Sequence, residues 1–222
     1  MNHFGLRCLT IGSCLYIIGD MLLVGFAEPK NEVKEHFGLS PMENRLAAFM
    51  LAGSTKRLFW GMMFGVFGAP FMLLGGLHFW GILKPGVLRT IILGFHIVGG
   101  AGATLAHGSF YFLGRVSKEI YKNALDRELY EDEKVFLKEI IHGTVIPWYV
   151  VVGSQVMSYL LIAIAIMFHL SDLSRWMVLF TPIVTIPIIY FLDKKWTFPA
   201  VFHGALYTIP VLLFAIVLWI PQ

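Results

Sequence analysis

Long apolar stretches separated by short charged segments dominate the pattern of hydrophobic and polar positions along the chain. A stretch of about 18 apolar residues is long enough to cross the hydrocarbon core of a bilayer as a helix. Proline and glycine occur inside several stretches, but neighbouring helices can satisfy the backbone groups that these residues leave free. We therefore predict six transmembrane helices, over residues 8–27, 58–83, 88–114, 143–168, 175–192 and 197–220.

The composition supports a membrane protein. Of the 222 residues, 57% are hydrophobic and only 14% are charged, whereas soluble domains carry roughly 25% charged residues. The first stretch contains Asp20 and is interpreted as a retained helix rather than a cleaved signal peptide. We expect one all-α domain over residues 1–222, a polytopic bundle of about six helices whose main partner is the lipid bilayer. No nucleic-acid-binding motif or basic patch is found.

Two connecting segments are long enough to have structure of their own. In residues 28–57, the sequence Ser40-Pro41-Met42-Glu43 is a capping-box pattern with proline at the first helical position, which predicts a short helix. In residues 115–142, acidic, basic and apolar residues alternate. This pattern predicts solvated extensions of the third and fourth helices, with ion pairs along their faces.

Lysine and arginine are distributed very unequally between the two sides of the predicted topology. One side receives Arg7, Lys84, Arg89 and Arg175, and the other side receives the remaining thirteen. Because short cytoplasmic loops carry the excess of positive charge, we expect a cell-membrane protein with both termini outside. Residues 28–57 and 115–142 would then lie in the cytoplasm.

Four ionisable residues within or at the edge of the spans are expected to lie near the cytoplasmic side. They are Asp20, His107, His142 and His203, each on a different predicted helix, and by helical rise they fall within roughly 10 Å of one membrane level. Charged groups inside a bilayer are costly and usually functional. We predict that these four side chains converge on one cavity, whereas His96 and His78 are interpreted as structural.

Such a cluster suits a divalent transition metal. Three histidines with a carboxylate can hold zinc and leave room for water, which then loses a proton near neutral pH. The resulting hypothesis is an intramembrane zinc-dependent hydrolase of a lipid amide or ester. His107, His142 and His203 would be ligands, and Asp20 a fourth ligand, an orienting group or a general base. Asp20 and His107 are the candidate catalytic residues.

Other functions fit the same residues. Each histidine could instead hydrogen-bond a neighbouring helix, with Asp20 paired to one of them. Prolines in the fifth span allow the broken helices of a transporter, although no internal repeat is visible. His107 and His203 could face each other across a haem. A non-catalytic lipid-binding protein is a further alternative.

Two sequence segments carry a resemblance to known proteins. Ile18-Gly19-Asp20-Met21-Leu22-Leu23-Val24-Gly25 and Ala106-His107-Gly108-Ser109-Phe110 resemble a family of uncharacterised bacterial multi-span membrane proteins. A more distant similarity, in residue types and depth, is to the superfamily of alkaline ceramidases and adiponectin receptors. That similarity implies an intramembrane zinc amidase. Members of that superfamily have seven spans and a His-x-x-x-His pair in the last one, where this chain has His203 and Tyr207.

Overall fold

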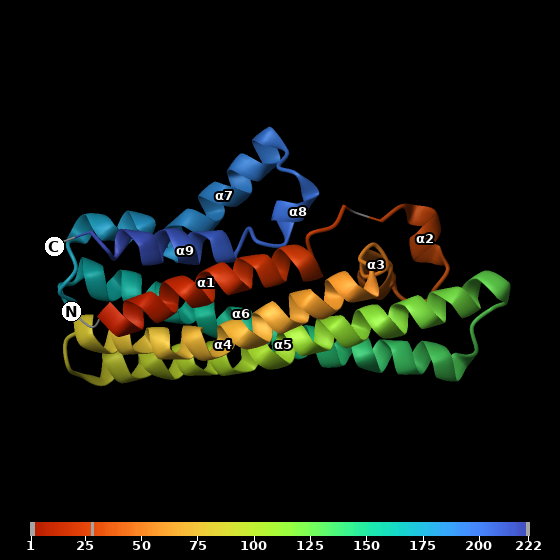
Figure 1. Cartoon of the computed structure of the whole chain (residues 1–222), viewed down its shortest axis with the longest axis horizontal. Helices are drawn as coiled ribbons and strands as arrows, with labels where there is room; N and C mark the ends of the chain where they lie inside the picture. Colours follow the sequence, from red (N-terminus) through yellow and green to blue (C-terminus); the bar gives the residue numbers. More distant parts are fainter. Residues whose placement is uncertain (1–2, 28, 221–222) are drawn as a thin grey trace.

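The chain folds as an all-α bundle, as predicted (Figure 1). A computed structural model describes residues 3–27 and 29–220, except for the side chains of Glu32 and Lys34. In chain order the elements are α1 (His3–Leu23), α2 (Asn31–Glu35), α3 (Pro41–Phe49), α4 (Thr55–Ile82), α5 (Val87–Asp126), α6 (Glu131–Met167), the 3-10 helix η1 (Arg175–Phe180), α7 (Pro182–Trp196), α8 (Ala200–His203) and α9 (Thr208–Val217).

The first four predicted spans fall in long continuous helices, although α1 ends at Leu23, before the predicted limit at residue 27. Within the described residues, α1, α4, α5 and α6 are long and apolar enough to cross a membrane. The expected span of residues 175–192 is instead divided between η1 and α7, and that of residues 197–220 between α8 and α9. Proline explains one break, because Thr181 precedes Pro182 and adopts an extended backbone (φ −60°, ψ 145°) in which a helix cannot continue. The second break lies at residues 204–207, between α8 and α9.

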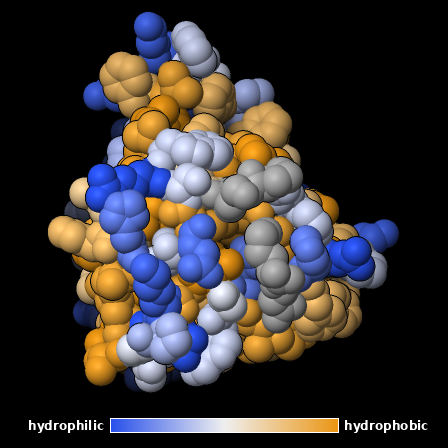
Figure 2. Space-filling view, turned by 90° about the vertical axis from the view of Figure 1, so that its left-hand side faces the viewer, coloured by the Kyte–Doolittle hydropathy of each residue, from blue (hydrophilic) through white to orange (hydrophobic). Residues whose placement is uncertain are grey.

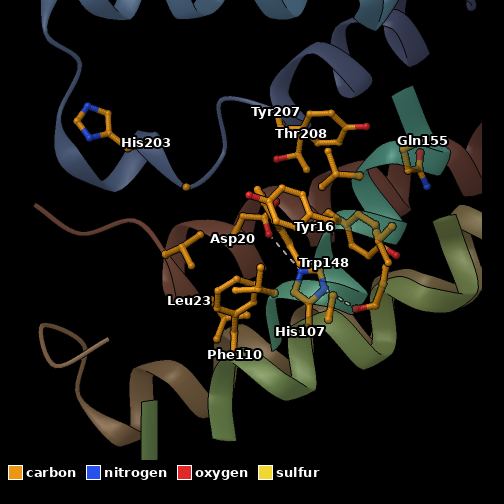
Figure 3. Close-up of a pocket in the computed structure, with 18 of the residues that line it drawn as sticks. Tyr16, Asp20, Leu23, His107, Phe110, Trp148, Gln155, His203, Tyr207 and Thr208 are labelled. Carbon is orange, nitrogen blue, oxygen red and sulfur yellow. Dashed lines mark hydrogen bonds and ion pairs between the residues drawn. The ribbon is translucent and has the colours of Figure 1, made fainter. Parts of the chain in front are cut away.

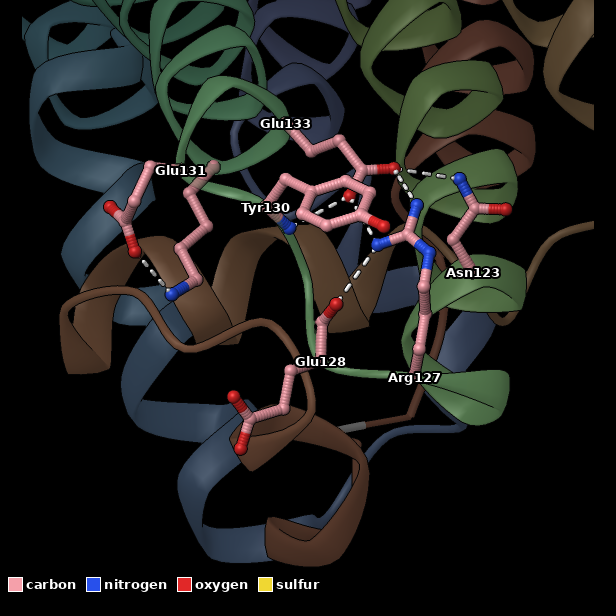
Figure 4. Close-up of polar contacts among 7 residues, drawn as sticks. Asn123, Arg127, Glu128, Tyr130, Glu131 and Glu133 are labelled. Carbon is pink, nitrogen blue, oxygen red and sulfur yellow. Dashed lines mark hydrogen bonds and ion pairs between the residues drawn. The ribbon is translucent and has the colours of Figure 1, made fainter.

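The two longest helices extend well beyond a bilayer. At about 1.5 Å per residue, the 40 residues of α5 measure roughly 60 Å, about twice the thickness of the hydrocarbon core. Their far ends meet in a polar tip (Figure 4), where both guanidinium nitrogens of Arg127 donate to Glu133 at 2.8 Å. Lys134 pairs with Glu131 at 2.7 Å. The predicted solvated extension with ion pairs is therefore confirmed.

The predicted short helix after Ser40 is also present, as α3. The Glu43 carboxylate accepts from the Ser40 backbone N–H at 3.2 Å and from the Ser40 hydroxyl at 2.7 Å, so it satisfies the start of the helix as a capping box does. At the other end, the Lys118 ammonium on α5 donates to the carbonyls of Met50 and Leu51. These bonds fix the end of α3 against α5.

Glycines bring α1 and α4 into direct backbone contact. A Cβ added at Gly12 would lie 2.8 Å from the backbone nitrogen of Met72, and one at Gly19 would lie 3.0 Å from Gly61 O and Gly65 N. Small residues of this kind allow membrane helices to approach closely. Gly61 and Gly65 of α4 are two of the residues that permit this approach.

Both described ends of the chain lie at one end of the bundle. The ring of His3 stacks on Trp219 with centroids 6.1 Å apart, as an even number of crossings requires. Figure 2 looks onto this end, where hydrophilic side chains form a band flanked by hydrophobic ones. Met1 and Gln222 lie outside the described residues, and which side of the membrane they face stays a prediction.

The close packing of α1 against α4 can be tested with a single methyl group. Gly12→Ala should lower the melting temperature in detergent, because overpacking of this kind destabilises by about 1–3 kcal/mol. Gly153→Ala is the matched control, since nothing lies within 4 Å of its added Cβ, and it should keep or raise the melting temperature. Equal melting temperatures for the two variants would contradict the backbone contact.

Candidate functional site

A cavity of about 500 Å³ lies between α1 and α6. Among the described residues no Cα of α6 comes within 8 Å of a Cα of α1 or α9, so these helices leave room between them. Residues of α5, with Ala103, Ala106 and His107, also line the cavity. Further lining residues come from α3, α7 and the segment from α8 to α9. We call this space the inner cavity.

Large aromatic residues fill the gap between the helices nearer the end that carries the termini. Phe79, Tyr159 and Phe214, from α4, α6 and α9, are fully buried, with ring centroids 6.4–6.5 Å apart. Towards the other end, Trp148 and Tyr149 of α6 and Tyr190 of α7 line the cavity and are also exposed on the protein surface, at 39%, 56% and 51%. The inner cavity therefore reaches the surface between α6 and α7.

Asp20 and His107 form an ion pair in the wall of the inner cavity. The imidazole Nε2 lies 3.2 Å from Oδ1 of Asp20, and Nδ1 lies 2.8 Å from the backbone carbonyl of Ala103 (Figure 3). The His107 side chain is 10% exposed and that of Asp20 is 20% exposed. Both nitrogens of His107 are thus already engaged by protein groups.

The geometry of this pair determines how many protons it holds. A carbonyl oxygen only accepts hydrogen bonds, so Nδ1 of His107 must carry a hydrogen. The bond between Nε2 and Oδ1 then needs one further proton, on the imidazole or on the carboxyl group. In both arrangements the Asp20–His107 pair shares this proton and has no net charge.

Several contacts position the pair. A Cβ at Gly65 would overlap the His107 ring, so this glycine of α4 makes room for the imidazole. At the end of α1, the Arg57 guanidinium donates to the carbonyls of Met21 at 2.7 Å and Gly25 at 2.9 Å. Gly204 lies directly against the carbonyl of Asp20, where an added Cβ would clash. The end of α1 that carries Asp20 is therefore held by Arg57 of α4 and by Gly204, which follows α8.

The other two predicted site residues are paired elsewhere. His142 Nε2 lies 3.2 Å from Glu43 of α3, and its side chain is 55% exposed. His203 Nε2 lies 3.3 Å from Asp193 at the end of α7. Although His203 lines the edge of the inner cavity, Figure 3 shows its ring directed away from Asp20 and His107.

Of the four residues predicted to converge on one cavity, Asp20, His107 and His203 line the inner cavity, whereas His142 does not. Each histidine meets its own carboxylate, and only Asp20 and His107 are brought together. Over the described ranges, no group of three or more His, Cys, Asp or Glu side chains is placed to hold a metal ion. The rings of His107 and His203, which were considered as haem ligands, do not face each other.

Sequence reasoning missed several residues of this region. Glu43, which was expected only as part of a helix cap, and Asp193 of α7 each pair with a histidine. Tyr16, Gln155 and Tyr207 line the inner cavity. Tyr16 precedes Asp20 by one helical turn, and Gln155 is a polar residue inside an apolar span. Both could therefore have been identified from the sequence as candidate site residues. His96 is structural as expected, because Nε2 donates to Met72 O at 2.7 Å.

The coupling of Asp20 to His107 can be measured with a double-mutant cycle. His107→Leu should lower the free energy of unfolding by about 2–3 kcal/mol, less than a fully buried pair because Asp20 keeps some exposure. Asp20→Leu combined with His107→Leu should recover part of this loss, since no unpaired carboxylate remains. The free energy of unfolding of each variant in the cycle is measured in detergent micelles. Strictly additive effects of the two substitutions would contradict the pairing.

Glu43 makes the stability dependent on pH. Its hydrogen bonds to Ser40 lower the pKa of the carboxyl group, and the charges of Lys138 and His142 lower it further. A lowered pKa stabilises the fold above the ordinary carboxyl pKa, and this contribution is lost as the pH falls through the folded value. Glu43→Gln should therefore lower the melting temperature at pH 7 and have progressively less effect below about pH 4.5. Glu139→Gln, at an exposed position, serves as the control. If the effect of Glu43→Gln on the melting temperature did not depend on pH, the ionised Glu43 carboxylate would not be its cause.

Comparison with known proteins places the chain in a family but assigns it no activity. No curated protein and no solved structure matches it. A family model described as a family of unknown function (DUF6796) matches residues 8–220, which is nearly the whole chain. The chain therefore belongs to the DUF6796 family.

Proposed function

We propose that this protein binds a single amphipathic molecule from the bilayer in its inner cavity, with the Asp20–His107 pair as a polar anchor. The observation that carries the proposal is the position of this pair in the wall of an otherwise largely apolar cavity of about 500 Å³. Cavities of about 300–1,000 Å³ with a few polar groups are typical of small-molecule sites. Residues that line the cavity and are also exposed, Trp148, Tyr149 and Tyr190, offer a lateral route from the lipid.

Binding is favoured over the hydrolysis expected from the sequence. A zinc-dependent lipid hydrolase needs an imidazole nitrogen free for the metal, and both nitrogens of His107 have protein partners. His142 and His203, the other proposed ligands, are paired with Glu43 and Asp193. The Asp20 carboxylate retains a second oxygen, which is available to accept a hydrogen bond from a bound molecule.

The proposed orientation puts the polar tip of α5 and α6 in the cytoplasm of the cell, with both termini outside the cell membrane. Thirteen of the seventeen Lys and Arg residues lie in the segments assigned to the cytoplasm, and the positive-inside rule expects the excess of positive charge there. The inner cavity, next to α3, would then lie in the cytoplasmic half of the bundle.

Native mass spectrometry of the delipidated protein tests the proposal. The probes are hexadecanol, hexadecanamide, hexadecanoate and hexadecylamine, which share one chain length. At least one probe should give an adduct of one molecule per chain. Ala106→Phe should abolish the adduct, because Ala106 is buried in the cavity wall and the larger side chain fills the space.

Leu105→Phe is the matched control. It introduces the same side chain at the preceding position, which is 61% exposed and does not line the cavity, so the adduct should persist. Absence of any adduct, or an adduct that Ala106→Phe leaves unchanged, would overturn the proposed function.

A further inference from the structure

Three polar side chains in the wall of the inner cavity have buried atoms without a hydrogen-bond partner among the described residues. They are the hydroxyls of Tyr16 and Tyr207 and both polar atoms of the Gln155 amide. Tyr16 is only 6% exposed and Gln155 only 4%. Buried polar groups in folded proteins are almost always paired, with protein, water or a ligand. We call these three side chains the unpaired polar set.

The unpaired polar set lies close to the Asp20–His107 pair. Tyr16 comes from α1, one turn before Asp20, and its ring centroid is 5.2 Å from that of His107. Tyr207 immediately precedes α9 and lines the same cavity as Asp20. Figure 3 shows Tyr207, Thr208 and Gln155 on the side of Asp20 opposite to His203. The unpaired polar set and the Asp20–His107 pair therefore line the same cavity.

Charge limits what this region can bind. The unpaired polar set is neutral, and the Asp20–His107 pair has no net charge while it shares one proton. Beside the unpaired polar set and this pair, a charged headgroup would lose its hydration without gaining an uncompensated opposite charge, which is unfavourable. The other ionisable side chains of the cavity wall, Arg45 and His203, come from α3 and α8. Tyrosine hydroxyls and the glutamine amide, by contrast, both donate and accept hydrogen bonds. Complementarity thus favours a neutral headgroup that also does both.

We propose that the molecule bound in the inner cavity is a single-chain lipid with a neutral headgroup that donates and accepts hydrogen bonds, namely a hydroxyl or an amide. Gln155, Tyr16 and Tyr207 are its recognition residues. This inference rests on the proposed function and specifies its ligand. The hydrocarbon chain occupies the apolar part of the wall, which includes Leu46, Phe49 and Phe110. The lipid amide expected from the sequence falls within this class.

The same four C16 probes, titrated separately at pH 7, test the inference. Hexadecanol and hexadecanamide should bind at least tenfold more tightly than hexadecanoate or hexadecylamine, both of which are charged at this pH. A preference for either charged probe would overturn the inference. Equal affinities for all four would also overturn it, since they would mean that water alone satisfies the unpaired polar set, while the proposed binding function would survive. Absence of binding by all four refutes the proposed function itself.

Gln155→Leu tests whether Gln155 forms hydrogen bonds with the headgroup. Its affinity for hexadecanamide should fall about tenfold, the value of one or two hydrogen bonds, and its affinity for hexadecanoate should stay the same. Tyr207→Phe should act in the same direction. Because Gln155→Leu removes a buried amide without a partner among the described residues, the ligand-free variant should be at least as thermally stable as the parent protein. A destabilised variant, or one with unchanged affinity for hexadecanamide, would contradict this role of Gln155.

Discussion

The close approach of α1 to α4 is the constraint on which the site depends. Gly12 and Gly19 of α1 and Gly61 and Gly65 of α4 remove the side chains that would otherwise separate the two backbones. The same glycine, Gly65, also leaves space for the ring of His107 from α5. One interface therefore fixes both partners of the Asp20–His107 pair, because it sets the position of α1 and admits the imidazole.

The arrangement of the remaining helices creates the cavity around this pair. The helix α1 packs on α4 and α9, α4 packs on α5, and α5 packs on α6, while α6 and α1 do not meet. The gap is filled by the aromatic residues Phe79, Tyr159 and Phe214 nearer the end with the termini. Elsewhere it stays open, and polar groups from α1, α6 and α9 face into it. A binding site results from helices that are held apart on one side and tightly joined on the other.

Neutrality connects the chemistry of the pair with its location. A lone carboxylate in an apolar wall would be strongly unfavourable, and a shared proton with His107 removes the net charge. His142 and His203, whose side chains are exposed, also each lie beside a carboxylate, near the polar end of the bundle. Three of the eight histidines thus pair with acidic side chains from other segments.

The sequence alone determined the all-α class, the first four spans, the α3 capping box and the charged extension of α5 and α6, because each depends on local periodicity or on residues three or four apart. It also identified Asp20 and His107 as buried ionisable residues. Only the tertiary structure decided their partners. Depth along a helix follows from residue number, but the direction of a side chain around the bundle depends on how helices pack, and so His142 and His203 meet Glu43 and Asp193 rather than each other. The break between α8 and α9 was likewise decided by packing, since Gly204 lies against the backbone of α1 at Asp20, a contact between residues distant in the sequence.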